Sequence, residues 1–487
     1  MSVEKNDASS RSSSTDAQEP ARATSHFDHL SKVRSLKTKE ERELAEARVI
    51  PDDGSSEMQI SERKLTWPQA TLLLLTEYVV LAILAFPSAF AVLGMAGGVL
   101  ATLIIGATTY WTSHVLWRFC LAHPEVRDIC DAAYVLTGGR WAWWAAFVGL
   151  ALNNWAIMGL HVNAGATAIQ TIRGGTECTL IWAVVVGVIM WIPSNIRELK
   201  HMAYIGVLAS STMFVCTILT ISGHGVQGLP NGAAPGETIK ITVWAPEGTT
   251  FVQGMDALLN IVYTWIGHAL IPSFVGDMAN PEDFPKALAV SMFFEFCLFT
   301  LTGAIVYSYA GQYSVAPGYG SLISKYAKPA AGLTMPTILL VGVLYSLITS
   351  RSIFFQIFPE GSKHRTRHTI VGWGTWLTIV FLGWVISFII GQSVPFFNGL
   401  LALISSLFDS WFGYILWAFC WYDLYRGQYF KGAGRTFEFF LNAAIMVTGF
   451  FFFGAGTYAS IQSILDSYAT GSIKKPFTCA NTGFTFS

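Results

Sequence analysis

Residues 250–288 read TFVQGMDALLNIVYTWIGHALIPSFVGDMANPEDFPKAL, and this stretch is the most informative about the fold. It begins as an apolar run of membrane length, but Gly267, His268 and Pro272 interrupt the run before a polar exit that starts at Asp277. A helix that breaks inside a bilayer exposes backbone amide and carbonyl groups, which is tolerated only where protein or a wet cavity surrounds them. The stretch therefore predicts a broken membrane helix and a candidate binding site.

Composition indicates that the rest of the chain lies in the same solvent. Of its 487 residues, 52% are hydrophobic and 13% are charged, and the mean hydropathy is +0.46. A soluble fold would have more apolar surface than it could bury. We therefore expect an all-α polytopic membrane protein. Apolar runs of about 20 residues predict eleven transmembrane helices, at 67–93, 97–121, 141–171, 178–193, 200–222, 251–278, 287–311, 335–358, 369–391, 395–421 and 437–465.

The distribution of Lys and Arg predicts the orientation. Loops that follow the even-numbered spans hold about twice as many Lys and Arg residues as the loops on the other side. This bias predicts a cytosolic N-terminus and an extracellular C-terminus. The net charge of −1 indicates nothing further about partners, and no nucleic-acid partner is expected.

The chain divides into three parts. Residues 1–65 contain the Ser-rich run Ser9 to Ser14 and almost no aromatic residues, so they predict a disordered cytosolic tail. Regulatory modification or the trafficking machinery can act on such a tail. Residues 66–466 form the predicted transmembrane transport domain, and 467–487 form a short extracellular tail. No apolar core follows the first charges, so we expect no cleavable signal peptide.

Cysteine usage predicts neither a metal site nor a cofactor. Most cysteines lie in or beside the apolar spans and have no metal-site spacing, so we interpret them as packing residues. Only Cys178 and Cys479 fall on the predicted outer face, where a disulfide can persist. The sequence does not give their separation and leaves this pairing open.

Five segments together resemble the amino acid/auxin permease family. They are Gly267 to Pro272 (GHALIP), Met278 to Leu288 (MANPEDFPKAL), Ile83 to Phe90 (ILAFPSAF), His123 to Asp131 (HPEVRDICD) and Pro476 to Asn481 (PFTCAN). The last two are most similar to fungal neutral amino acid permeases of that family. The resemblance implies a proton- or sodium-coupled amino acid transporter with the five-plus-five inverted repeat of the bacterial leucine transporter. The eleventh helix would be peripheral.

Two features of the residues agree with an inverted repeat, and two depart from the family pattern. Spans one and six run in opposite directions, and each carries a proline interruption, at Pro87 and Pro272. The family commonly has Gly-x-Gly in helix 1 where this chain has Val80-Leu-Ala82, and paired glycines before the helix 6 histidine where this chain has Ile266-Gly267. Without glycine the backbone has less freedom to unwind, so a straight helix with a kink at Pro87 is the alternative.

The predicted substrate site lies where helices 1 and 6 break. A half-helix that starts beyond Ala82 can receive a carboxylate at its N-terminal amides, and carbonyls of Trp265 and Ile266 can receive an ammonium. Since Lys and Arg are absent around these points, we expect neutral aliphatic or aromatic substrates. The alternative is that Trp265 is a packing residue and that His268 only caps a freed carbonyl. The candidate substrate-binding residues are Val80, Ala82, Ile83, Leu84, Ala85, Tyr263, Trp265, Ile266, Gly267 and His268.

Ionisable residues inside a membrane are costly unless they are paired or hydrated, so they indicate function. Those deepest in the predicted spans are Glu77, His161, His268, Glu295 and Asp409. Glu77 lies roughly 15 Å from the inner end of helix 1, at about 1.5 Å per residue, which is a depth similar to that of three hydroxyls on helix 8. The spacing of these hydroxyls, in the predicted eighth span at 335–358, resembles the helix 8 part of the sodium site in the leucine-transporter fold. We therefore predict a coupling-ion site for a proton, or alternatively for sodium. Glu295 and Asp409 are rival proton carriers or structural partners of neighbouring helices. The candidate coupling residues are Glu77, Ser346, Thr349 and Ser350.

Each hydroxyl of helix 8 can instead bond the carbonyl four residues before it, which is the structural alternative. A channel would need polar stripes along several helices, and an enzyme would need a nucleophile and base set, and the sequence shows neither. We therefore expect no enzyme, with a transporter-like amino acid sensor as the main rival. The resemblance implies a plasma-membrane location, with the vacuolar membrane as the alternative.

Overall fold

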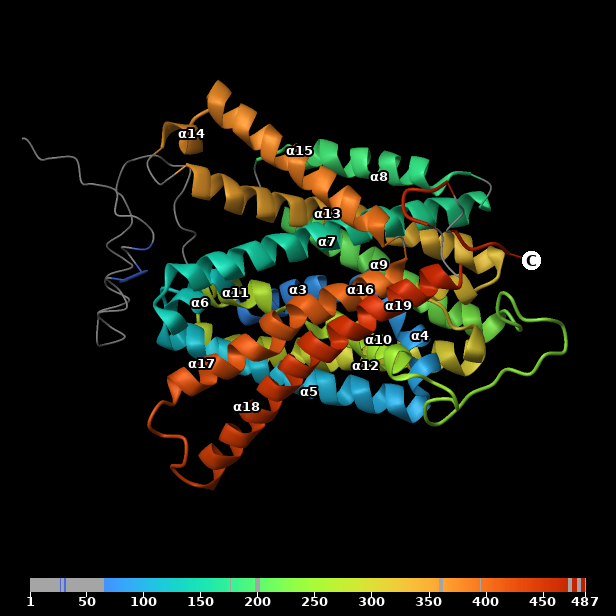
Figure 1. The fold of residues 1–487 in the computed structure, drawn as a ribbon, viewed down its shortest axis with the longest axis horizontal. Coiled ribbons are helices and arrows are strands. Elements are labelled where there is room, and N and C mark those ends of the chain that lie inside the picture. Colours follow the sequence, from blue (N-terminus) through green and yellow to red (C-terminus); the bar gives the residue numbers. More distant parts are fainter. Residues whose placement is uncertain are drawn as a thin grey trace, which may run out of the picture.

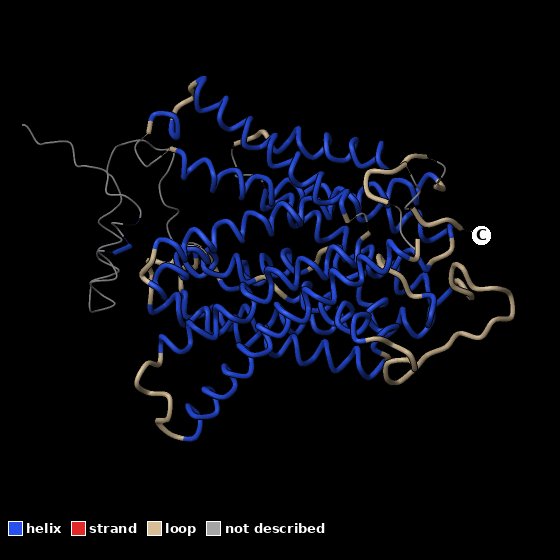
Figure 2. The backbone as a smooth tube through the Cα atoms, in the orientation of Figure 1, coloured by secondary structure: helices blue, strands red, loops and turns tan. Residues whose placement is uncertain are grey.

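The computed structural model describes residues 27, 30, 31, 65–175, 177–197, 202–358, 362–394, 396–471, 475–479 and 483–486. Their backbone is helical apart from connecting loops and one isolated bridge between Leu65 and Met278. Figure 2 shows the helices running along one common direction, with loops gathered at the two ends of the bundle. In the absence of water, only a backbone that satisfies its own hydrogen bonds can span a membrane, which explains this all-helical arrangement.

The first five spans form the first repeat, and helix 1 is interrupted within it (Figure 1). They comprise α3 (Trp67–Tyr78), the 3₁₀ turn η1 (Leu81–Ala85) and α4 (Phe86–Leu93) as helix 1, followed by α5 (Met95–Ala122), α7 (Arg140–Arg173), α8 (Thr179–Ser194) and α9 (Met202–Val226). A short helix that the sequence did not predict, α6 (Ile129–Thr137), connects α5 to α7.

The second repeat begins with the interrupted helix 6. It comprises α10 (Phe251–Trp265), the turn η2 (His268–Leu270) and α11 (Ile271–Asp277) as helix 6, followed by α12 (Phe284–Ala310), α13 (Ser324–Ile357) and α15 (Ile370–Ser393). Helix 10 completes this repeat and consists of α16 (Phe397–Ile404), η6 (Ser405–Ile415) and α17 (Leu416–Leu424). Helix 11 follows as α18 (Ala433–Phe451), η7 (Phe452–Gly456) and α19 (Thr457–Ala469), and the short α14 (Lys363–Thr366) precedes α15. Figure 1 shows α18 diverging from the bundle, which suits a peripheral helix.

Nine helices in the described part of the chain are long and apolar enough to cross a membrane. The bent pair α3 and α4 and the shorter apolar α8 bring the number of spans to the predicted eleven. The largest difference in boundaries is at α13, which begins at Ser324 rather than at residue 335. Lys325 and Lys328 ended the apolar run, but a helix continues past charged residues once it leaves the hydrocarbon region.

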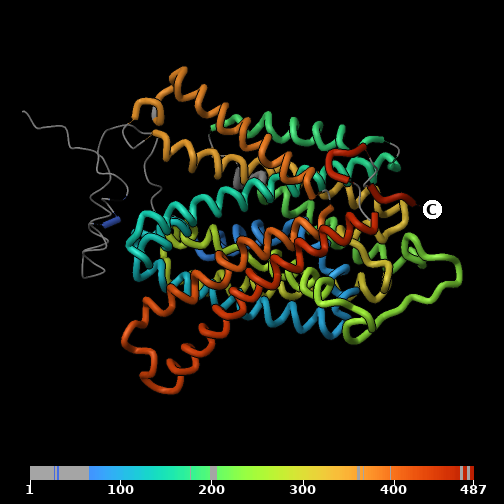
Figure 3. The backbone as a smooth tube through the Cα atoms, viewed as in Figure 1, coloured from blue at the N-terminus to red at the C-terminus, as the bar shows by residue number. Residues whose placement is uncertain are grey.

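The interrupted helices lie in the middle of the bundle, where Figure 3 shows the blue segments of helix 1 beside the yellow-green segments of helix 6. Contacts of α10 with both η1 and α4 bring the two helices together. On another side, α13 packs along α7 and α9. The two breaks are therefore enclosed by helices rather than exposed to lipid.

The C-terminal residues are attached at the end of the bundle that carries the 227–250 loop (Figure 1). A disulfide joins Cys178 to Cys479, the pairing that the sequence left open. Beyond it, the ring of Phe484 packs edge-on against Tyr319 at 5.8 Å. The segment that follows α19 is thus tied to the loop before α8 and to the loop before α13.

Two residues of the N-terminal segment also pack against the bundle. Phe27 lies 5.5 Å from Trp143, with Arg140 over its ring at 4.9 Å, and Leu30 is 1% exposed in the same cluster. This cluster also contains Cys130 of α6. The predicted disorder of the tail concerns residues that, apart from Phe27, Leu30, Ser31 and Leu65, lie outside the described part of the chain.

Candidate functional site

Helix 1 is broken, and the break does not lie at Pro87. Helix α3 ends at Tyr78, and the segment that begins at Leu81 leaves at an angle of 47°. Val80, at the break, has an extended backbone with φ −122° and ψ 176°, a conformation that suits β-branched residues. Pro87 occupies the first turn of α4, where the helix needs no backbone N–H from it. The alternative of a straight helix with a kink at Pro87 is therefore wrong.

Helix 6 breaks where the sequence predicts. Helix α10 ends at Trp265, Ile266 is extended with φ −97° and ψ 102°, and the inner segment resumes through η2 into α11. Gly267 is required by a close approach, because a Cβ there would lie 2.6 Å from Cζ of Tyr78. The tyrosine before the break in helix 1 therefore packs directly on the break in helix 6, and the prediction of a discontinuous helix 6 is confirmed.

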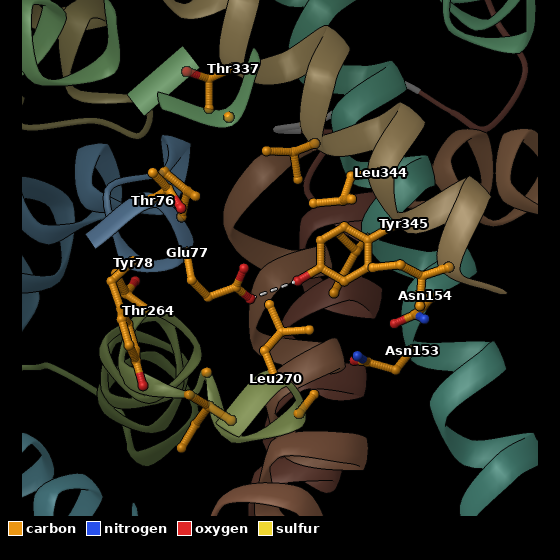
Figure 4. Close-up of a pocket in the computed structure, with 18 of the residues that line it drawn as sticks. Thr76, Glu77, Tyr78, Asn153, Asn154, Thr264, Leu270, Thr337, Leu344 and Tyr345 are labelled. Atoms are coloured by element: carbon orange, nitrogen blue, oxygen red, sulfur yellow. Dashed lines mark hydrogen bonds between the residues drawn. The ribbon is translucent and has the colours of Figure 1, made fainter. Parts of the chain in front are cut away.

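A cavity of about 280 Å³ lies between the two breaks. Its wall is built by helix 1, α7, α9, helix 6, α13 and helix 10. Most of the lining is apolar, and Figure 4 shows Glu77, Tyr345, Asn153 and Asn154 converging on the space between their helices. Among the described residues, no Lys or Arg side chain lines this cavity, so no fixed positive charge from these residues is present to attract an anion.

Five of the predicted site residues line the cavity, and the others do not. Those in the wall are Glu77, Val80, Tyr263, Ile266 and Gly267. Ala82, Ile83, Leu84 and Ala85 lie outside the cavity wall and are almost completely buried. The start of the outer half-helix thus faces the cavity only through Val80.

Trp265 lies in packing rather than in the cavity wall. Its side chain is 1% exposed, and its ring meets Phe299 of α12 edge-on at 4.9 Å. The Trp265 ring also lies against Gly106 of α5, where a Cβ would approach within 2.9 Å. The structure thus places Trp265 as a packing residue, because α10 directs its side chain toward α5 and α12 while Tyr263 and Ile266 face the cavity.

His268 is also directed away from the cavity. Its Nε2 lies 2.8 Å from Oγ1 of Thr112 and 3.3 Å from Oγ of Ser113, both on α5. The ring stacks on Trp417 at 5.9 Å. His268 therefore binds side chains of α5 rather than a carbonyl freed by the break, and it fixes the inner part of helix 6 to its neighbours.

Glu77 faces the cavity from the last turn of α3. The hydroxyl of Tyr345 donates a hydrogen bond to its Oε1 at 3.3 Å, drawn as a dashed line in Figure 4. Tyr345 is thus the residue of α13 that contacts Glu77, although the sequence pointed to the neighbouring hydroxyls. The signal in the sequence that could have found Tyr345 was an aromatic residue with a hydroxyl group at the same predicted depth as Glu77.

The three hydroxyls of α13 lie on a face that does not line this cavity. Ser346, Thr349 and Ser350 are all buried, and Oγ1 of Thr349 accepts a hydrogen bond from Asn154 at 2.9 Å. Oγ of Ser346 has no hydrogen bond within the described residues. Because successive residues of a helix are about 100° apart, Tyr345 and Ser346 cannot both face Glu77. Their assignment to a coupling-ion site remains a prediction.

Other polar residues complete the wall. His161 of α7 lines the cavity, and its Nδ1 lies 2.8 Å from the carbonyl oxygen of Ile157. Asp409 of η6 lines it as well, whereas the buried carboxyl of Glu295 does not. Within the described residues, no group of three His, Cys, Asp or Glu side chains is arranged to hold a metal ion.

Comparisons with known proteins agree with this architecture. The chain is 30% identical to the N amino acid transport system protein of Neurospora crassa, over 86% of this chain and 88% of the relative. It is 27% identical to a transmembrane transporter of Gibberella moniliformis, over 87% of this chain and 89% of that protein. The inward-facing structure of Mhp1 has the same fold, with a TM-score of 0.51 and 14% identity over 84% of this chain and 92% of that chain.

The family model described as transmembrane amino acid transporter protein matches residues 63–462. This match includes ten spans and most of the eleventh, together with every residue that lines the cavity. The chain therefore belongs to the transmembrane amino acid transporter family.

Proposed function

We propose that the protein imports neutral aliphatic or aromatic amino acids by proton-coupled symport across the plasma membrane. The observation that carries the proposal is the cavity at the two helix breaks, which has mostly apolar walls, a hydrogen-bonded carboxyl group at Glu77 and, among the described residues, no Lys or Arg. Its volume of about 280 Å³ is close to the lower end of ligand cavities, about 300–1,000 Å³, and suits a solute as small as an amino acid.

The backbone at the breaks supplies partners for both charges of the zwitterion. The first amides of a helix have no intrahelical acceptor, so those next to Val80, where the outer half-helix reaches the cavity wall, suit the substrate carboxylate. The carbonyls of Trp265 and Ile266, at the end of α10, suit the ammonium group for the opposite reason. The apolar side chains from α7, α11 and α13 then receive the substrate side chain. Recognition of the head by backbone groups accounts for the tolerance of both aliphatic and aromatic substrates.

Glu77 is the proposed proton carrier. Burial away from water disfavours the charged form of a carboxyl group, so Glu77 takes up a proton before a loaded, closed cavity forms. Tyr345 orients its carboxylate toward the cavity. Sodium coupling through the hydroxyls of α13 is the alternative to proton coupling. The name of the Neurospora relative, N amino acid transport system protein, supports transport over amino acid sensing.

The test uses purified full-length protein in liposomes. Radiolabelled alanine, leucine and phenylalanine are offered outside, with a proton gradient and a sodium gradient imposed separately. We expect accumulation driven by the inward proton gradient alone. Accumulation driven only by sodium would reject the proton, and binding without flux would make the protein a sensor. A fluorescently tagged chain in its own host separates the plasma membrane from the vacuolar membrane.

A further inference from the structure

A second carboxyl group lies in the same cavity as Glu77. Asp409 is 6% exposed and lines the cavity from η6, a π-helical stretch in the middle of helix 10. Its Oδ2 has no hydrogen bond within the described residues. Interruptions of this kind inside α-helices are frequent at functional sites. A buried carboxyl group in the wall of the substrate cavity, with one oxygen that no described residue hydrogen-bonds, requires a ligand or a proton.

In the described part of the chain, the groups that face Asp409 are tyrosines, Glu77 and one histidine, with no Lys or Arg among them. Tyr263 of α10 and Tyr345 of α13 lie close enough to interact electrostatically with both Asp409 and Glu77. His161 of α7 faces the same cavity, and Tyr414 interacts with Asp409 from η6 itself. Within the described part of the chain, no Lys or Arg side chain lines the cavity. Tyrosine hydroxyls can orient a carboxylate, but they cannot balance its charge.

Charge balance then limits the states in which the cavity can close around substrate. A zwitterionic amino acid and a neutral His161 add no net charge, so two ionised carboxylates leave the occupied cavity at −2. Bound substrate displaces the water that would hydrate these carboxylates, and an unpaired charge at bilayer depth is costly. In the empty carrier, water fills the cavity and hydrates both ionised groups. The loaded cavity is neutral only when each carboxyl group carries one proton.

We propose that Asp409 is a second proton-carrying site, so that two protons accompany each neutral amino acid. This inference rests on the proposed proton coupling. Outside, each carboxylate binds one proton. Inside, both protons are released as substrate leaves and water enters. One cycle therefore moves one amino acid and two positive charges, and it returns both carboxylates to their ionised form.

The number of charges per substrate is measurable as a reversal voltage. Full-length protein in liposomes is given a tenfold outward gradient of radiolabelled leucine, equal pH on both sides and no sodium, and the potassium diffusion potential is varied. Net leucine flux stops at about 30 mV if two charges move with each leucine, and at about 59 mV if one charge moves. We expect about 30 mV, inside negative, for the natural protein.

Asp409→Asn should move the reversal voltage from about 30 to about 59 mV, because one proton site is lost. Asp409→Glu should keep it near 30 mV and serves if the asparagine variant folds poorly. Asp256→Asn is the control, since Asp256 does not line the cavity and interacts with Ser460 and Ser463 of α19. It should leave the reversal voltage unchanged.

Three results would overturn the inference. The first is a natural protein that reverses near 59 mV, which leaves proton coupling intact but assigns it one proton. The second is Asp409→Asn that still reverses near 30 mV. The third is a change to 59 mV caused by Glu295→Gln instead, which would place the second proton in α12. Leucine flux that depends on neither the membrane voltage nor the proton gradient would instead reject the proposed proton-coupled transport.

Discussion

Gly267→Ala is expected to impair transport, because it fills the contact between the two broken helices. The added Cβ would lie 2.6 Å from Cζ and 2.7 Å from Oη of Tyr78. Carbon atoms in contact need about 3.5–4.0 Å, so the Tyr78 ring must move by about 1 Å. Tyr78 is 1% exposed and borders the cavity, so the open direction is the space that substrate uses. Overpacking of this kind costs about 1–3 kcal/mol.

If that cost falls on the substrate-bound form, affinity decreases about 5- to 150-fold, since each 1.4 kcal/mol is a factor of ten. The assay is the KM for leucine uptake in liposomes, with the amount of folded protein measured in parallel. Gly276→Ala on α11 is the matched control, because its Cβ would meet nothing within 4 Å. Adding Tyr78→Phe to Gly267→Ala removes the Oη contact and should restore part of the affinity. A KM equal to that of the natural protein would refute the requirement for glycine at the break.

Three further predictions concern packing and orientation. Trp265→Ala should lower the stability of the folded protein by about 3–5 kcal/mol, because it leaves a cavity against Phe299 and Gly106, and the KM of the protein that still folds should be unchanged. Thermal unfolding in detergent measures the stability, and uptake kinetics measure the KM. An altered KM at normal stability would show that Trp265 contacts substrate. Cys178→Ser should make Cys479 reactive toward a membrane-impermeant maleimide added outside intact cells, and labelling only after permeabilisation would reverse the predicted orientation. Phe27→Ala should expose Cys130, which is 1% accessible in the structure, to thiol reagents in permeabilised cells. Cys216 is the buried reference. Unchanged labelling of Cys130 would show that Phe27 does not cover this cluster.

Local sequence patterns were sufficient to predict the membrane environment, the all-helical class and the break in helix 6. Apolar runs of membrane length leave the backbone no partners except its own, so span number and helical structure follow from local composition. The break in helix 6 falls beside Gly267, a residue that weakens a helix, and Pro272 follows in the first turn of α11, where proline is favoured. These features depend on residues close together in the chain, and the structure confirms them.

Which side chains face the cavity depends on how the helices pack, and the sequence did not predict it. Valines favour an extended backbone only weakly, so the break at Val79 and Val80 depends on the helices around it. Tyr345 rather than Ser346 reaches Glu77 because of the rotation of α13, which no local pattern sets. In the same way, α10 turns Trp265 into packing, and Cys178 meets Cys479 across a sequence separation of 301 residues. These outcomes depend on contacts between segments far apart in the chain, and such contacts form only when the whole bundle is packed.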